Sequence, residues 1–216
     1  MKWDVDIESA RALVADKLLW PRVRDFLWDF PSQIHPSHLD DPALAKLLSS
    51  ESAHIKKWIL EALKIQPCFH LFPKDDWSRL ALLDSKTLEA IAGWLGALSF
   101  APALRRVTDS KTVRALKAAL PGIYPGVLSF TMYFTNIALE DASIESPEAI
   151  LKRGYGMLFS LCRTIPEDVM YRLRLKLPKQ FSDETETAAV GDAKTLAPAL
   201  KRLMKLEFPE AYSLCC

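Results

Sequence analysis

Glycine is scarce in this sequence, with seven among 216 residues, and no glycine-rich stretch of the kind that cradles phosphate groups is present. Net charge is also almost absent at +1, so no overall field recruits nucleic acid or anionic lipid. No period-two alternation of apolar and polar residues predicts a strand. The fold class that remains is all-α, and we expect a compact single-domain multi-helix bundle over residues 1–216.

Paired cysteines are lacking as well. The four cysteines show no paired spacing, and two of them are adjacent: Cys68, Cys162, Cys215 and Cys216. This pattern is a poor disulfide framework and fits a reducing compartment. The first six residues, Met-Lys-Trp-Asp-Val-Asp, are charged and have none of the apolar core of a signal peptide. We therefore expect an intracellular protein.

One long run lacks charge. Between Lys117 and Glu140 there are 22 uncharged residues, enough to span a bilayer. Pro121-Gly122 and Pro125-Gly126 interrupt the first half of this run, and hydroxyl and amide side chains dilute the second half. We predict a turn followed by a buried helix over 127–139, without membrane insertion.

The centre of the chain, Trp77–Leu120, contains a near-repeat. Residues 84–91 and 109–116 both begin Asp-Ser-Lys-Thr, and each copy continues with apolar residues at helical spacing. Asp and Ser are N-cap residues, and Pro102 between the copies cannot lie inside a long helix. We predict two capped helices joined by a bent connector and packed as a central helical hairpin. The similarity arises either from duplication or from convergence on capping chemistry.

Cap and proline signals predict further helices along the chain. Residues 31–39 hold two prolines around Ile34, which predicts an ordered loop packed on the core. In the helix after Pro166, Val169 and Leu173 mark an apolar face, and we expect the basic side chains to lie opposite it. A mobile polar loop is predicted at 179–194, and the C-terminal residues are apolar enough to dock back. The other expected helices cover 7–19, 23–30, 42–49, 53–63, 147–162, 167–177 and 195–207.

A few residues have the chemistry of a catalytic or metal site. Among them, His35, His38, Cys68 and His70 are metal-ligand types, but their spacing is unusual for zinc, and loop histidines bonded to backbone are the alternative. Cys68 or Cys162 with a histidine is a candidate for nucleophilic catalysis, without a local signature. We expect no cofactor and no enzyme. An α-helical enzyme or metal-dependent regulator using His35, His38, Cys68 and His70 is the rival hypothesis.

Charge is patterned locally. Residues 105–117 carry a local charge of +4, from Arg105, Arg106, Lys111, Arg114 and Lys117 against Asp109. Residues 140–148 carry −4, from Glu140, Asp141, Glu145 and Glu148. Solvated helix faces account for such patches, and docking to another protein is the alternative. The basic stretch contains no aromatic residue, which disfavours a nucleic-acid surface.

Three segments carry short motifs of one known protein family. Trp28–Leu39 holds an aromatic residue followed by Ile-His-Pro-x-x-Leu. The second segment is Leu95–Leu98 and Ala101–Val107, followed by Asp109 and Val113–Leu116, and the third is Phe208-Pro209 with the terminal Leu-Cys. These segments resemble the N-terminal signature, the central segment and the end of the SctK family of type III secretion proteins, which includes YscK, PscK, OrgA and MxiK, although His38 stands where a larger Trp or Arg is usual. The loop 179–194 has no counterpart in the family.

The resemblance implies a non-enzymatic adaptor of the secretion sorting platform, at the cytosolic face of the bacterial inner membrane. Its partners would be the cytoplasmic domain of the inner-membrane ring protein SctD and the pod protein SctQ, with no nucleic acid, and we expect a monomer in isolation. Candidate protein-binding residues are Arg105, Arg106, Arg114 and Lys117, together with His35 and His38.

Overall fold

The computed structural model describes residues 7–39, 46–48, 50–65, 70–73, 77–130, 134–137, 144, 146–182 and 192–216. Every regular element in these ranges is a helix, so the predicted all-α fold class is confirmed. The elements fall into two compact units, each drawn from separate stretches of the chain. The single-domain organisation stays a prediction.

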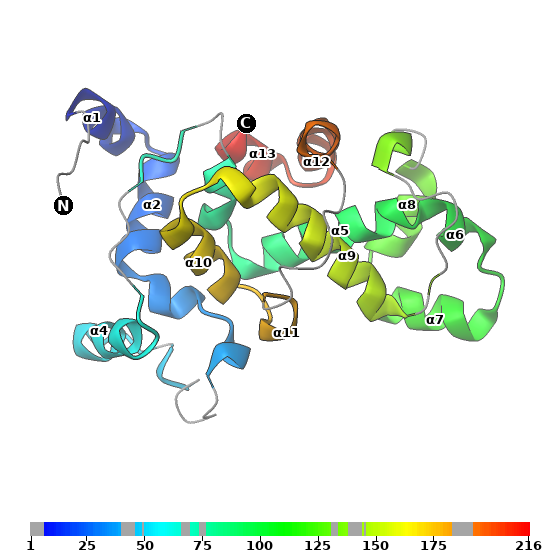
Figure 1. Cartoon of the computed structure of the whole chain (residues 1–216), viewed down its shortest axis with the longest axis horizontal. Helices are drawn as coiled ribbons and strands as arrows, with labels where there is room; N and C mark the ends of the chain where they lie inside the picture. Colours follow the sequence, from blue (N-terminus) through cyan, green and yellow to red (C-terminus); the bar gives the residue numbers. More distant parts are fainter. Residues whose placement is uncertain are drawn as a thin grey trace. The chain divides into compact units, whose positions relative to one another are not determined.

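Unit 1 comprises residues 1–85, 164–182 and 210–216, and unit 2 comprises residues 86–163 and 183–209. Figure 1 colours the chain by residue number, so the stretches that make up each unit can be found in it. The helices of unit 1 are α1 (Ile7–Ala15), α2 (Leu19–Trp28), η1 (Phe30–Gln33), η2 (Pro36–His38), α4 (Ala53–Ala62), η3 (Trp77–Leu82), α10 (Glu167–Leu175), α11 (Lys179–Ser182) and α13 (Pro209–Cys215). Those of unit 2 are α5 (Ser85–Ser99), α6 (Ala101–Arg106), α7 (Ser110–Ala119), α8 (Ile123–Phe130), η5 (Thr135–Ile137), α9 (Pro147–Leu161) and α12 (Ala193–Glu207), and η6 (Cys162–Thr164) lies at the boundary.

Unit 1 is built around α10, whose inward face carries two cations. Arg172 and Lys176 are buried, and Lys176 is buried completely. The expectation that they lie opposite the apolar face is therefore wrong, because they follow Val169 at spacings of three and seven residues, which share one helix face. The Arg172 guanidinium donates a hydrogen bond of 2.6 Å to the Phe26 carbonyl of α2 and lies over the Phe26 and Phe30 rings.

Lys176 ties α10 to η3 and to the residue after it. Its Nζ donates to the carbonyl oxygens of Ala81, at 2.5 Å, and Leu83, at 2.9 Å. Burial lowers the pKa of Lys176 to about 7, and the nearby Asp84 carboxylate opposes this shift. A neutral amine keeps two N–H donors, so both hydrogen bonds persist when the side chain loses its proton.

The loop between α2 and α4 and the C-terminal helix both pack on this unit. Phe30 and Ile34 are buried, which confirms that 31–39 is an ordered loop on the core. Arg79 of η3 is buried and donates through Nε to the Phe72 carbonyl and through Nη1 to the Leu214 carbonyl of α13, at 2.6 and 2.8 Å. The predicted docking of the C-terminal residues is thus confirmed.

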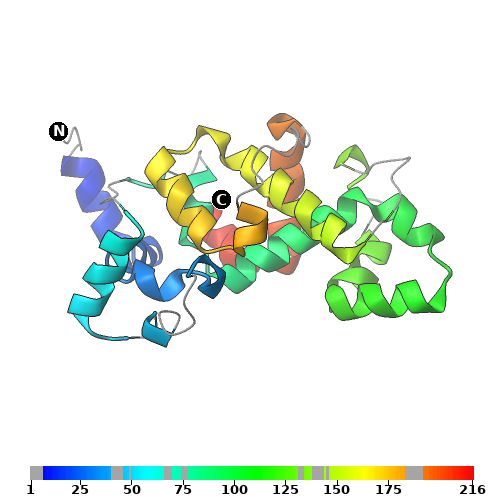
Figure 2. The same cartoon turned by 60° about the horizontal axis from the view of Figure 1, so that its bottom comes forward.

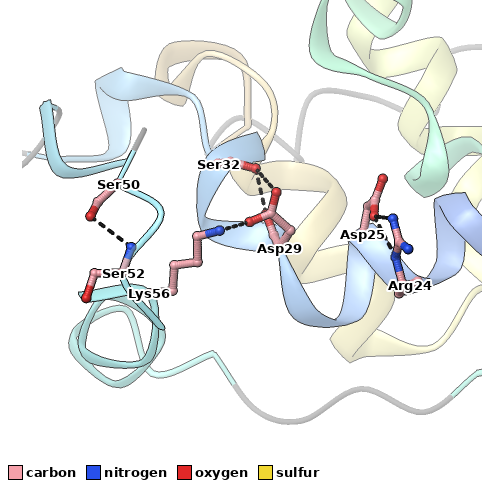
Figure 3. Close-up of polar contacts among 7 residues, drawn as sticks. All are labelled: Arg24, Asp25, Asp29, Ser32, Ser50, Ser52 and Lys56. Carbon is pink, nitrogen blue, oxygen red and sulfur yellow. Dashed lines mark hydrogen bonds and ion pairs between the residues drawn. The ribbon is translucent and has the colours of Figure 1, made fainter. Parts of the chain in front are cut away.

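Polar contacts hold α4 to the end of α2 (Figure 3). Lys56 forms an ion pair with Asp29, and the Ser32 hydroxyl donates to the Asp29 carboxylate. Ile59 of α4 is buried, whereas Trp58 is 43% exposed. Neighbouring residues of a helix point about 100° apart, so Trp58 and Ile59 cannot face the same layer equally.

In unit 2, α5 and α9 cross with their backbones in contact. A Cβ on Gly96 would lie 2.0 Å from the Ile150 carbonyl oxygen, and a Cβ on Gly154 would lie 1.8 Å from the Ala92 carbonyl oxygen. Only glycine permits this approach, so the crossing depends on two of the chain's few glycines. Figure 1 shows α6, α7 and α8 following α5 at the far end of this crossing.

The predicted caps are present in unit 2. The Asp109 carboxylate accepts a hydrogen bond of 2.7 Å from the Thr112 backbone N–H at the start of α7, and Ser146 caps α9 through the Ala149 N–H. The bent connector of the predicted hairpin is itself a short helix, α6, with Pro102 in its first turn. In Figure 2, α7 is the green helix that follows α6 through residues 107–109, and it packs against α8 and α9.

The uncharged run after Lys117 is divided by a turn at Gly122, whose φ is +76°. The continuous buried helix expected over 127–139 is wrong. Helix α8 begins earlier, at Ile123, because Pro125 is tolerated in a first turn, and it ends at Phe130, while Thr135–Ile137 form the separate helix η5. Leu128 and Ser129 are exposed. Residues 131–133 and 138–139 lie outside the described ranges. Within those ranges, no helix combines the length and apolar character needed to cross a membrane.

Two other predicted segments fall partly on residues that the structure does not describe. The mobile loop predicted at 179–194 is wrong at both ends, because 179–182 form α11 and 193–194 begin α12, while 183–191 lie outside the description. Most of the helix predicted at 42–49 also lies outside, although Lys46 and Leu47 are helical.

Replacing Gly96 or Gly154 by alanine is expected to destabilise the protein by about 3 kcal/mol each, because backbone atoms stand where the methyl group would go. Gly93→Ala, on the same helix as Gly96, is the matched control, since its Cβ would come close only to the flexible end of Ile123, at 2.9 Å, with ordinary contacts to Leu151 and Leu120. Chemical denaturation measures all three. Equal midpoints for Gly93→Ala and Gly96→Ala would contradict the crossing.

Stability should rise with pH between about 7 and 9. In this range Lys176 is neutral when folded but protonated when unfolded, so unfolding takes up a proton, and the slope approaches about 1.4 kcal/mol per pH unit. Above about pH 9 the buried Cys215, whose pKa is raised to about 12, works in the opposite direction. Lys176→Met should flatten the slope, and Met in place of the exposed Lys86 should not. An unchanged slope in Lys176→Met would refute this assignment.

Candidate interaction surfaces

The basic stretch predicted from the sequence forms one surface of unit 2. Its five cations are Arg105 and Arg106, in the last turn of α6, and Lys111, Arg114 and Lys117 of α7. All five are exposed, whereas Leu116 and Leu120 turn inward, as the helical spacing predicts. We call these five residues the α6–α7 surface.

No anion neutralises the α6–α7 surface within the part of the chain that the structure describes. None of its five cations forms an ion pair there. Asp109, the acid between α6 and α7, is engaged by both the backbone N–H and the hydroxyl of Thr112, each at 2.7 Å. These hydrogen bonds lower the pKa of Asp109, the backbone one contributing most, so its carboxylate serves as a cap. The acidic stretch 140–148 lies mostly outside the described residues.

The two histidines of the Ile-His-Pro segment lie in unit 1, where they close the C-terminal end of α10. The His35 backbone N–H donates to the Leu175 carbonyl, and His38 Nε2 donates to the Leu177 carbonyl, both at 2.8 Å. The last carbonyls of a helix have no partner within their own helix, so the His35 N–H supplies a missing donor to Leu175, the last residue of α10, while His38 binds the carbonyl of Leu177 just beyond the helix. The segment therefore has a structural role that its sequence pattern did not indicate.

Ser37 completes the same arrangement. Its backbone N–H donates to His35 Nδ1 at 3.2 Å, which makes this nitrogen an acceptor and places the ring proton on Nε2. The Ser37 hydroxyl lies 2.7 Å from the same Nδ1 and accepts from the Lys179 backbone N–H at 2.9 Å. This geometry agrees with loop histidines bonded to backbone, the simpler of the two interpretations of His35 and His38.

The metal-site interpretation finds no support among the described residues. They contain no group of three or more His, Cys, Asp and Glu side chains placed to hold an ion. The His70 ring packs edge-on against Phe72, with 5.0 Å between ring centroids. Cys68 lies outside the described ranges. Cys162 is not part of a disulfide and is completely buried, as the sequence-based view of an inert cysteine expects.

A second exposed surface was missed by the sequence analysis. On α2, Trp28 is 61% exposed and its ring meets Trp20 edge-on, with centroids 5.9 Å apart. Leu18, at the start of the same helix, is 70% exposed. We call Trp20 and Trp28 the α2 aromatic surface. Trp20 and Trp28 are eight residues apart, which keeps them near one face of a helix, and this spacing was the available signal.

A comparison with known protein families finds a match to part of the chain. Residues 25–123 match the family model YscK, described as YOP proteins translocation protein K. Over these residues, a little less than half of the chain, the protein is similar to the YscK family. The match supports a type III secretion protein, in agreement with the resemblance seen in the sequence motifs. No curated protein and no solved structure matches the chain.

The YscK match includes every residue proposed from the sequence for protein binding. It begins within α2, passes through the Ile-His-Pro segment, and ends at the start of α8. The matched region of this YscK-like protein thus contains the complete α6–α7 surface. It also contains the two hydrogen bonds from His35 and His38 to the carbonyls of Leu175 and Leu177, which we call the clasp. The binding role of the six residues stays a prediction, and the geometry favours the four arginine and lysine residues over the two histidines.

The clasp predicts different outcomes for two His38 variants. His38→Ala should cost about 1–2 kcal/mol of stability, because it leaves the Leu177 carbonyl without its donor. His38→Gln should retain most of the stability, since its amide N–H₂ reaches the position of Nε2. Thermal unfolding distinguishes the two. If both variants are as stable as the wild type, the hydrogen bond contributes nothing, and His38 becomes available for another role.

Proposed function

We propose that this YscK-like protein is a non-enzymatic adaptor of the type III secretion sorting platform. It would link the cytoplasmic domain of the inner-membrane ring protein SctD to the pod protein SctQ, in the bacterial cytoplasm at the inner membrane. The observation that carries the proposal is the YscK match over residues 25–123, which contain the complete α6–α7 surface.

Two exposed surfaces of unlike chemistry support an adaptor. The α6–α7 surface of unit 2 is cationic and has no aromatic residue, whereas the α2 aromatic surface of unit 1 exposes tryptophan. Charged residues at the rim of a protein–protein interface act mainly on association rate and specificity, and aromatic side chains supply much of the affinity. A protein that binds two different partners needs two such surfaces, and here each lies on its own compact unit.

The proposal is tested first by co-precipitation. Tagged SctD cytoplasmic domain should retain SctQ only when this protein is added, because an adaptor bridges partners that do not bind each other. In the host, deletion of the gene should abolish secretion and pod assembly while the membrane rings remain. Normal secretion in the deletion strain would refute the proposal.

Charge reversal should separate binding from stability. Arg106→Glu, Arg114→Glu and Lys117→Glu together should change unfolding by no more than about 0.5 kcal/mol per site, because all three side chains are exposed. Binding to SctD or SctQ should weaken, and its salt dependence should flatten, because exposed charges act through screened electrostatics. Titrations at two ionic strengths beside a thermal melt measure both effects. If the triple variant binds both SctD and SctQ as tightly as the wild type does, the α6–α7 surface is only solvated charge and takes no part in binding.

A further inference from the structure

We infer that the α6–α7 surface binds an acidic amphipathic helix of a partner protein, which deepens the proposed adaptor function and rests on it for the partner's identity. The surface carries five exposed cations without an ion pair among the described residues, and the acid between α6 and α7 is engaged as a cap. Charge complementarity therefore points to an anionic ligand that brings several negative groups.

A compact anion such as phosphate finds no converging site here. The N-terminus of α7, where backbone N–H groups would hold an anion, is already occupied by the Asp109 side chain. Lys111, Arg114 and Lys117 instead lie at intervals of three residues along α7, so their attachment points extend over roughly 9 Å. An extended ligand with repeated carboxylates matches this row, whereas a single anion does not.

Small side chains beside the cations point to a helical ligand. Ala115, Ala118 and Ala119 are all exposed, and helix geometry places Ala118 between Lys111 and Arg114 around the outer face of α7. Helices approach to about 8–10 Å where the side chains between them are small. A partner helix lying on these alanines would bring acidic residues at spacings of three or four against the row of cations.

The binding test uses four fluorescein-labelled probes. The first is a stapled helix with glutamate along one face and alanine between, and the second is its lysine counterpart. The third has the composition of the first but is broken by proline, and the fourth is a duplex DNA. Vesicles of phosphatidylglycerol in phosphatidylcholine are assayed in parallel by flotation. The full-length protein is measured as wild type, Arg114→Glu/Lys117→Glu, Ala118→Gln, and a charge-matched control in the same unit, Lys86→Glu/Lys205→Glu.

The inference predicts a reversal of preference. The wild type and the control should bind the glutamate helix about tenfold more tightly than the lysine helix or the proline-broken peptide. Arg114→Glu/Lys117→Glu should prefer the lysine helix, because the complementary charges are exchanged. Ala118→Gln should weaken the glutamate helix about threefold without a change in thermal midpoint, because its longer side chain holds the helix away.

Other results would overturn the inference in specific ways. Equal binding of the proline-broken peptide would show attraction of charge without a helix. Capture of DNA or vesicles, lost in Arg114→Glu/Lys117→Glu while the glutamate helix does not bind, would assign the surface to nucleic acid or lipid. Concentration-dependent dimers in sedimentation that the same variant abolishes would assign it to a second copy of this chain.

Titration with SctD and SctQ separates this inference from the adaptor proposal. If the wild type binds either protein and Arg114→Glu/Lys117→Glu binds it equally well, the adaptor proposal stands and the helix-binding surface is refuted. If the wild type binds the glutamate helix but neither protein, the adaptor proposal fails and the surface belongs to another acidic partner. Support for both proposals together requires two results. The wild type must bind SctD or SctQ, and Arg114→Glu/Lys117→Glu must lose this binding while the Lys86→Glu/Lys205→Glu control keeps it.

Discussion

The hydrogen bonds that α10 makes to backbone carbonyls are the constraint on which unit 1 depends. Arg172 and Lys176 enter an apolar interior and donate to carbonyls of α2, η3 and the residue after η3. Truncating such a buried cation leaves these carbonyls without donors, which usually costs more than the hydrogen bonds contribute. The carbonyl of the last residue of this helix accepts from His35, and that of Leu177 just beyond it accepts from His38, so residues 167–177 fix several separate stretches of chain.

The family-matched region contains residues whose hydrogen bonds hold the structure together and residues that stay exposed. The Ile-His-Pro segment is occupied by its hydrogen bonds to α10, whereas the cations of α6 and α7 have no ion pair in the described part of the chain. In unit 2, the glycine crossing of α5 and α9 plays the corresponding structural role, because it fixes the helices from which α6 and α7 continue. Exposed side chains that carry charge without an ion pair suit a surface that docks to another protein.

The helices and their caps could be predicted from local chemistry, whereas several side-chain positions could not. Asp109 and Ser146 act through neighbours three residues away, so the sequence alone contains the whole interaction. The positions of Arg172 and Lys176 differ from expectation because their spacing, not their charge, decides which helix face they occupy. Their hydrogen-bond acceptors lie more than ninety residues away in the chain, so no local pattern reveals them. The exposure of the α6–α7 cations was predictable from the pattern of apolar residues in α7. The clasp at His38 was not, since Leu177 is 139 residues distant.

The central claim is that the outer face of α7 meets a partner protein in the assembled apparatus. Site-specific photo-crosslinking from position 118, on the exposed face of α7, tests this most directly, with position 129 on the exposed part of α8 as the control. The account predicts a crosslink from position 118 to SctD or SctQ that disappears in the Arg114→Glu/Lys117→Glu background and is absent from position 129. No crosslink from position 118 in secreting cells, or the same crosslink from both positions, would contradict it.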